Sequence, residues 1–130
     1  MATEKVLIAG EWRDADATGT FQADNPTTME PLESVFPISS WADCDAALNS
    51  AAAAFLEMRS MPGEKIAGFL EAFAAKIEER ADELVEAAHA ETALPKSPRL
   101  ADVELPRTTG QLRQAAAAAR SENWKQPLPP

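Results

Sequence analysis

Short apolar segments alternate with turn residues over the first 38 positions, a pattern typical of β-hairpins. The segments "VLI" and "EW" flank "AG", where Gly10 can supply the positive φ of a tight turn. A second strand pair is predicted for "TFQAD" and "PLESVFP", joined by the turn "NPTTME" and ended by Pro37. Two hairpins in residues 1–38 are marginally stable alone, so we expect them to pack on other elements.

The spacing of apolar residues changes to a helical period after Ser40. Ser40 and Asp43 form a pair like a capping box, with Asp in place of the usual Glu or Gln. The segment "SMPG" ends this helix, and Pro62 suits the first position of the next one. The first predicted helix has one apolar stripe, made by Cys44, Leu48, Ala51, Phe55 and Met58.

The clearest helical pattern follows Pro62 and ends before Pro95. Within it, "EERADE" marks a break or bend, where Asp82 could cap a fresh turn. The apolar face of this second helix contains Ile66, Phe69, Leu70, Phe73 and Ile77, and Leu84, Val85 and Ala88 extend it.

A third helix is predicted to begin with Ser97 as cap and Pro98 as first helical residue, and to run to about Arg120. Pro106 interrupts it, and we expect a kink or a restart there, since proline removes one backbone hydrogen bond. The sequence therefore predicts an α+β chain. It comprises two β-hairpins (residues 1–38), three or four amphipathic helices (residues 40–120) and a non-helical tail (residues 121–130).

The charge is strongly acidic and unevenly distributed. The 130 residues carry a formal net charge of −9, which argues against binding to nucleic acid. Residues 1–95 hold 6 basic and 18 acidic residues, a net charge of −12, whereas residues 96–130 hold 6 and 3, a net charge of +3. We therefore expect the basic C-terminal part to contact the acidic body or a partner.

The single cysteine cannot form an internal disulfide and fits a reducing compartment. The first residues contain no apolar segment long enough for a signal peptide, and no run approaches the roughly 20 apolar residues of a membrane span. These features predict a cytoplasmic protein without a membrane partner.

Cys44 is the first candidate for chemistry, because a thiol in the first turn of a helix can be reactive. Its neighbours Asp43 and Asp45 oppose a thiolate, however, and Cys44 begins the apolar stripe of the first helix. A buried structural cysteine is the favoured interpretation.

His89 is the only histidine, and a general base needs a partner that orients it. Glu86 is the one acidic residue at helical spacing, so a surface histidine near a helix C-terminus is favoured. The acidic pairs Glu78-Glu79 and Asp82-Glu83 lack the glycine turn of a calcium loop and are interpreted as a solvated helix face. Gly-rich phosphate loops and nucleophile elbows are absent from the sequence.

The segment "RTTGQLRQ" (residues 107–114) contains groups that bind phosphate well. On a straight helix, however, Arg107 and Arg113 lie about 120° out of alignment, because six residues turn the helix by about 600°. Arg99, Arg113 and Arg120 lie closer to one edge. The geometry favours a docking helix over an anion cradle, with Gly110 allowing close backbone approach. Its apolar stripe is made by Leu105, Thr109, Leu112 and Ala116.

Taken in order, four segments resemble the N-terminal region of the aldehyde dehydrogenase superfamily. They are "LIAGEWRDA", "FQADNPTTMEPLESV", the capped helix "SSWADCDAALNSAAAAF" and "FLEAFAAKIEERADELVEAAHAETALP". The similarity extends from about Val6 to Trp124, and it implies part of the α/β fold of that superfamily. "RTTGQLR" resembles the NADP-preferring branch that oxidises 2-oxoglutarate semialdehyde (2,5-dioxopentanoate).

Three positions depart from the family pattern. Met29 stands where the turn usually has glycine, and Ala93 replaces the glycine of the usual Glu-Thr-Gly at a helix exit. Each side chain costs about 1 kcal/mol if the backbone keeps a positive φ. The third departure is Pro106, which stands where a helix-compatible residue is expected.

The resemblance implies an NAD(P)-dependent enzyme in which a cysteine thiolate attacks the aldehyde, hydride passes to NAD(P) and the thioester is hydrolysed. The family's catalytic and cofactor-binding residues lie beyond the matched region. No catalytic, cofactor-binding or metal-binding residue is therefore assigned here, Cys44 included. The 130 residues alone are expected to be inactive and to bind no cofactor.

The expected partner is the remainder of the dehydrogenase chain, or a second copy that covers exposed apolar helix faces. The alternative is a small non-enzymatic helical module that binds another protein through its basic C-terminal helix. A part of a dehydrogenase should leave apolar helix faces bare, whereas a finished module should not.

Overall fold

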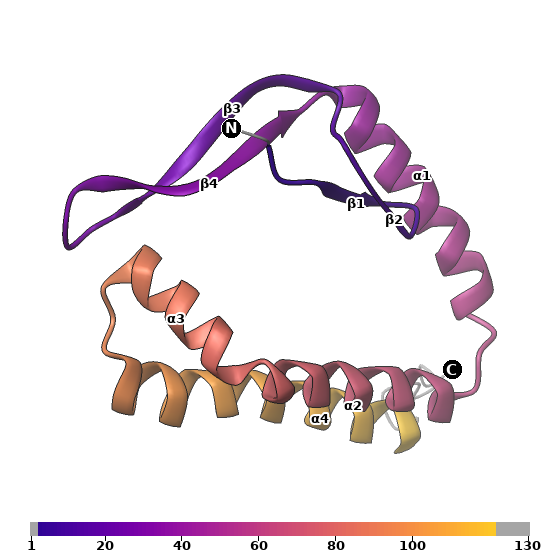
Figure 1. Ribbon diagram of the computed structural model, residues 1–130. Helices are drawn as coiled ribbons and strands as arrows, with labels where there is room; N and C mark the ends of the chain where they lie inside the picture. Colours follow the sequence, from indigo (N-terminus) through magenta and orange to yellow (C-terminus); the bar gives the residue numbers. More distant parts are fainter. Residues whose placement is uncertain (1–2, 122–130) are drawn as a thin grey trace, which may run out of the picture. The chain divides into compact units, whose positions relative to one another are not determined.

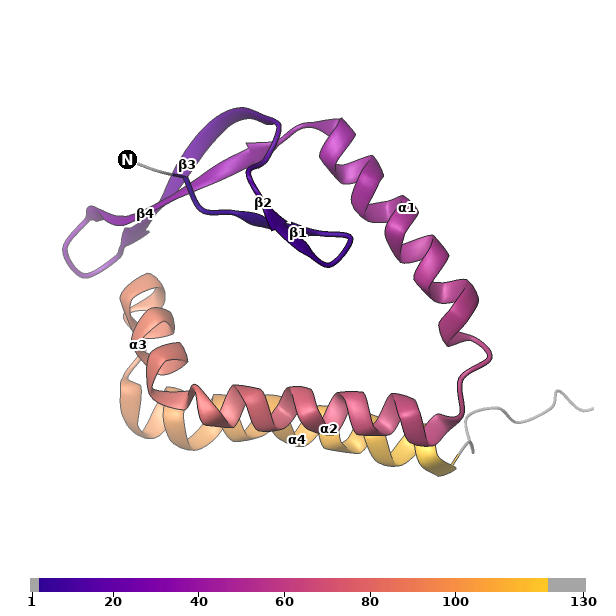
Figure 2. The same cartoon turned by 45° about the vertical axis from the view of Figure 1, so that its right-hand side comes forward.

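The computed structural model describes residues 3–121, and the chain divides into two compact units, residues 1–59 and 60–130. The first unit contains two antiparallel strand pairs followed by a helix, and the described part of the second is helical (Figures 1 and 2). This order confirms the predicted α+β class. Of the predicted tail, only Ser121 is described, and it ends the last helix; residues 122–130 lie outside the described residues.

The first hairpin pairs β1 (Val6–Ile8) with β2 (Glu11–Arg13) through a two-residue turn. Both turn residues have positive φ, 54° at Ala9 and 85° at Gly10. Two consecutive positive φ angles are what a type I′ turn requires, and its twist matches that of the strands. The sequence indicated the positive φ at Gly10 but not the one at Ala9.

The second hairpin pairs β3 (Ala17–Asn25) with β4 (Glu30–Ser39). Phe21 and Phe36 are direct cross-strand partners, and their rings stack with centroids 5.5 Å apart. β4 continues past Pro37 to Ser39, so the predicted end of the strand at Pro37 was wrong. Proline is tolerated there because the strand is the edge of a two-stranded sheet, where a missing N–H breaks no ladder bond.

The turn between β3 and β4 holds Met29 at a φ of 61°. The side-chain Oδ1 of Asn25 accepts the N–H of Thr27 at 2.9 Å, and the N–H of Met29 donates to the backbone oxygen of Asn25 at 2.8 Å. The left-handed conformation that glycine usually supplies in this turn is therefore kept by a methionine whose residue surface is 80% exposed.

Helix α1 (Trp41–Met58) begins as predicted, because the hydroxyl of Ser40 accepts the backbone N–H of Asp43 at 3.4 Å. The return bond of a capping box is not made. The N–H of Ser40 donates instead to the backbone oxygen of Asp16 at 2.8 Å. The capping-box prediction is thus correct only in its first half, because the Asp43 carboxylate is engaged by Arg13 and by the Asp16 N–H.

The second unit is built on α2 (Gly63–Glu79) and α4 (Leu105–Ser121), which lie side by side and antiparallel (Figures 1 and 2). Helix α3 (Ala81–Thr92) leaves this pair at an angle, and segment η1 (Lys96–Glu104) contacts both α3 and α4. Small side chains lie between α2 and α4, and their size lets the two backbones approach closely. The buried residues of this interface are Ala67, Ala74, Thr109 and Ala116.

Gly110 is not the point of close approach between these helices. A Cβ atom placed on Gly110 would meet no other atom within 4 Å, whereas Thr109 and Ala116 are only 2% and 0% exposed. The prediction for Gly110 was therefore wrong, although the predicted stripe at Thr109 and Ala116 does face α2.

The break inside "EERADE" is confirmed at Arg80, whose φ of −109° and ψ of 23° separate α2 from α3. Asp82 lies in the first turn of α3 and is not its N-cap, so that assignment was wrong. Pro62 is the N-cap residue of α2 and not its first helical residue, so the helix begins one position later than predicted. Helix α3 ends at Ala93, which has a φ of 57° and a ψ of 11°.

The predicted restart near Pro106 is confirmed, since η1 passes into α4 at Leu105. The N–H groups of Leu100 and Leu105 donate to carbonyl oxygens five residues back, so this stretch is wider than an α-helix. Pro106 follows in the first turn of α4, where a missing N–H costs little. Ser97 has an extended backbone, but its hydroxyl donates to Asp102 at 2.8 Å and does not cap a helix as predicted.

Candidate functional site

Ion pairs between α2 and α4 form the most extensive polar cluster of the second unit. Arg113 donates through both terminal nitrogens to the two carboxylate oxygens of Glu78, at 2.6 and 2.7 Å. This fork-to-fork geometry is the most specific that an arginine can form with a carboxylate. We call the set of Arg113, Arg120, Glu64, Glu71 and Glu78 the α2–α4 seam.

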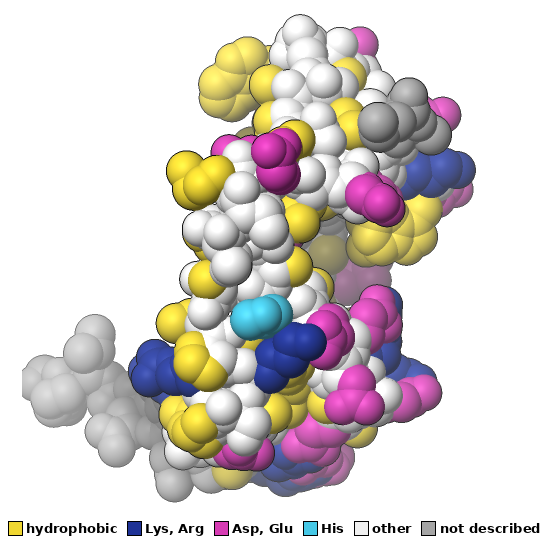
Figure 3. Space-filling model, turned by 60° about the vertical axis from the view of Figure 1, so that its left-hand side comes forward, with side chains coloured by type: hydrophobic (Ala, Val, Ile, Leu, Met, Phe, Trp, Pro, Cys, Tyr) yellow, Lys and Arg dark blue, Asp and Glu magenta, His cyan; other side chains and the backbone are white. Residues whose placement is uncertain are grey.

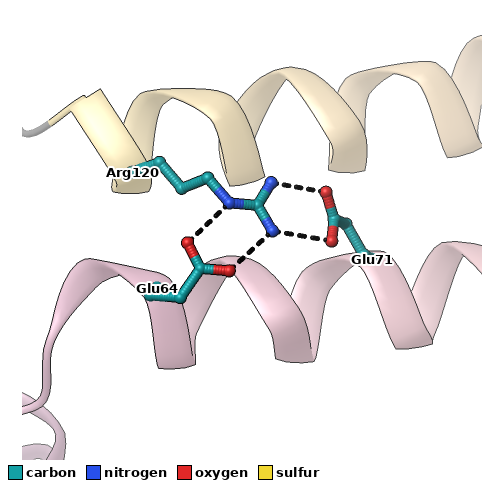
Figure 4. Close-up of polar contacts among 3 residues, drawn as sticks. All are labelled: Glu64, Glu71 and Arg120. Atoms are coloured by element: carbon teal, nitrogen blue, oxygen red, sulfur yellow. Dashed lines mark hydrogen bonds and ion pairs between the residues drawn. The ribbon is translucent and has the colours of Figure 1, made fainter.

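Arg120 lies between two carboxylates of the α2–α4 seam (Figure 4). Its Nε and Nη2 donate to Glu64 at 2.8 and 3.0 Å, and its Nη1 and Nη2 donate to Glu71 at 2.5 and 2.8 Å. Both carboxylates come from α2, and the guanidinium comes from the last turn of α4. The contact therefore ties the end of α4 to the first half of α2.

The hydrogen bonds of the seam shift the ionisation of its members. The bonds from Arg113, and next from Thr109, lower the pKa of Glu78 to about 2. The bonds from Arg120 lower the pKa of Glu64 and of Glu71. In return, these carboxylates raise the pKa of both arginines. The seam is thus fully ionised at neutral pH, and its positive charge is already balanced.

The two arginines of "RTTGQLRQ" do not converge on an anion site. Arg113 contacts Glu78 across the helix pair, whereas Arg107 lies 3.9 Å from Glu104, on the preceding turn. Arg99 also contacts Glu104, at 2.5 Å, and not α2. Of the three arginines predicted to share one docking edge, only Arg113 and Arg120 dock on the acidic helix.

An apolar groove of about 410 Å³ lies between α2, α3, η1 and α4. It is open to solvent, and Glu104 and Thr108 are the polar residues in its wall. Such a groove is a candidate binding surface, because apolar surface left open to water is costly. Its apolar lining consists of Phe73, Ile77, Leu84, Val85, Ala88, Leu100 and Leu105.

The apolar surface continues from this groove along α2, because Phe73 lines the groove and stacks on Phe69. Phe69 and Phe73 stack with ring centroids 6.3 Å apart, and they are 62% and 51% exposed. In the first unit, Trp41, Leu48 and Phe55 of α1 are also mostly exposed. Figure 3 shows hydrophobic side chains reaching the surface between clusters of charged ones. Each unit thus exposes large apolar side chains.

Cys44 is exposed in the structure, so the predicted buried position was wrong. The apolar stripe of α1 in which it was counted is itself largely exposed, which removes the reason for burial. Asp43 and Asp45 remain its sequence neighbours. Within residues 3–121, no basic side chain forms an ion pair or a hydrogen bond with the thiol.

His89 lies in the last turn of α3, as predicted, and is half-buried. Its Nδ1 donates to the backbone oxygen of Leu94 at 2.7 Å, which helps to close the helix end. Glu86 does not orient it, because that carboxylate accepts two bonds from Lys96. The geometry supports a structural role for His89.

The acidic pairs do not gather into a cation site. Glu78 binds Arg113, and Glu79 and Glu83 pair with Lys76 and Arg80 on their own helix turns. Across residues 3–121, no three His, Cys, Asp or Glu side chains are grouped so that they could hold a metal ion.

Asp43 is the one buried carboxylate of the described residues, and sequence reasoning missed its partners. Its two oxygens accept from Arg13 Nη2 at 2.6 Å and from the N–H of Asp16 at 2.8 Å. The partners lie 27 and 30 positions away, and no local pattern indicated them. These contacts join the start of α1 to the end of β2 and to the segment between β2 and β3.

Comparison with known proteins identifies the family to which this chain belongs. The sequence profile described as the aldehyde dehydrogenase family matches residues 12–129. The chain belongs to the aldehyde dehydrogenase family. The predicted resemblance is thereby confirmed, and the segment corresponds to the N-terminal region of such dehydrogenases.

Among curated relatives, this aldehyde dehydrogenase segment is 41% identical over 119 residues to the alpha-ketoglutaric semialdehyde dehydrogenase 2 of Azospirillum brasilense. That match covers 91% of the chain and 22% of the relative. It is 43% identical over 65 residues to the D-glyceraldehyde dehydrogenase (NADP(+)) of Picrophilus torridus, with coverage of 48% and 13%. The chain thus spans less than a quarter of the length of these relatives.

Solved structures of aldehyde dehydrogenases share the fold. The Mycobacterium tuberculosis aldehyde dehydrogenase complexed with NAD+ superposes with a TM-score of 0.80 at 28% identity, over 95% of this chain and 26% of that one. The aldehyde dehydrogenase of Bartonella henselae gives a TM-score of 0.82 at 22% identity, over 92% and 25%.

Few Lys and Arg side chains of residues 3–121 lie outside ion pairs, so the described part of this dehydrogenase segment offers few cations to the phosphates of a dinucleotide. Phosphate binding needs cations that are available, or glycine-rich backbone at a helix start. Most Lys and Arg side chains of residues 3–121 are instead in ion pairs with carboxylates. No step of NAD(P) chemistry is assigned to them. The described helices also lack the combination of length and hydropathy that would cross a membrane.

Proposed function

We propose that this chain forms the N-terminal part of an NAD(P)-dependent aldehyde dehydrogenase that oxidises an aldehyde to a carboxylate. The observation that carries the proposal is the family match over residues 12–129 together with the shared fold. The candidate substrate is 2-oxoglutarate semialdehyde, since the relative that matches 91% of the chain is named for it. NADP is the candidate cofactor, because "RTTGQLR" resembles the NADP-preferring branch and the second relative is named as an NADP(+) enzyme.

The role proposed for these residues is structural. The α2–α4 seam and the Asp43 contact hold the two units in their shapes, while the nucleophile, general base and cofactor site come from the rest of such an enzyme. The 130 residues alone are then inactive. Turnover of any aldehyde by the purified chain, followed as NADP reduction, would overturn this part of the proposal.

The bare apolar surfaces support a larger assembly over a finished interaction module. We propose that the groove and the Phe69–Phe73 surface of α2 are covered by the remainder of an aldehyde dehydrogenase chain. A completed helical module would have no reason to leave two phenylalanine rings more than half exposed on one helix.

The test is a chimera in which this chain replaces the matched region of the Azospirillum brasilense relative. We expect the chimera to oxidise alpha-ketoglutaric semialdehyde with NAD or NADP. A folded, soluble chimera without activity would contradict the assignment to this part of the enzyme.

Phe69→Ser tests the covered surface within the same chimera. In the isolated chain we expect a loss of about 0.5–1.5 kcal/mol in the free energy of unfolding, because the mostly exposed ring loses chiefly its stacking on Phe73. In the chimera we expect a lower melting temperature and lower activity. The matched control is Ala75→Ser, at an exposed position about 120° around α2 from Phe69, which should have the same small effect in both contexts. Equal effects of Phe69→Ser in both contexts would show that nothing covers the ring.

A further inference from the structure

We draw no further inference here: the strongest candidate, the apolar groove that α2, α3, η1 and α4 enclose in the second unit, belongs to the surface already described under the proposed function, and nothing else in the structure shows what covers it.

Discussion

Ala93→Gly should stabilise the helical unit, because Ala93 ends α3 in the left-handed conformation with a φ of 57°. That conformation costs an L-residue about 1–2 kcal/mol, whereas glycine adopts it freely. Glycine also gives the unfolded chain more freedom, which offsets about 0.5–1 kcal/mol of the gain. Ala93 is exposed, so no packing is lost. The expected net effect is a stabilisation of about 0.5–1 kcal/mol.

The assay is equilibrium unfolding in urea, followed by helical circular dichroism. The matched control is Ala87→Gly, which makes the same chemical change at an exposed position inside α3. There glycine should cost about 1 kcal/mol, because it loses more backbone freedom in a helix. The two substitutions should therefore have opposite signs. If Ala93→Gly destabilises the chain as Ala87→Gly does, then position 93 does not hold a left-handed backbone and the reasoning fails.

Three further substitutions test the contacts described above. Asp43→Ala should cost about 1–3 kcal/mol because it leaves a backbone N–H unpaired, while Asp45→Ala, exposed on the same turn, should cost almost nothing. Ala74→Leu should cost about 1–3 kcal/mol by overpacking the α2–α4 interface, and Ala75→Leu beside it should be tolerated; both are measured by urea unfolding. Arg113→Gln should flatten the acid dependence of stability.

The sign of that acid dependence follows from Glu78. Its pKa is depressed from 4.5 to about 2 in the folded chain, so its contribution is complete above pH 4.5 and is lost as the pH falls towards about 2. Urea midpoints measured from pH 5 down to about pH 2 should fall less steeply for Arg113→Gln than for the parent chain. Parallel curves would mean that the seam at Glu78 does not form in solution.

Local features of the fold were readable from the sequence, since each depends on a few neighbouring residues. The Ser40 cap and the break near Arg80 are of this kind. The glycine exchanges at Met29 and Ala93 predicted strained backbone, and both residues have a positive φ. These signals are local because caps and turns are fixed by bonds within about four residues.

Contacts between distant residues were not readable in the same way. Nothing near Asp43 indicated that its carboxylate would turn to Arg13 and away from the helix start. Cys44 was assigned to a core because its stripe is apolar, but an apolar stripe does not specify whether its partner lies within the same unit. One long-range signal was used only in part. The spacing of the arginines in α4 predicted a docking edge, but the matching seven-residue spacing of the glutamates in α2 was not used.

That spacing explains why α2 exposes its largest side chains. Positions seven apart share one face of a helix, so Ala67 and Ala74 form a smooth strip against α4. Glu64, Glu71 and Glu78 lie beside that strip and meet Arg113 and Arg120. The helix pair is thus closed by alanine and by ion pairs, and it leaves no space for the phenylalanines. Phe69 and Phe73 fall on a different face, where apolar area of this size lowers the free energy only when something else covers it. The alanines that pack against α4 and the phenylalanines that need a cover therefore lie on opposite faces of α2, about half a turn apart around its axis.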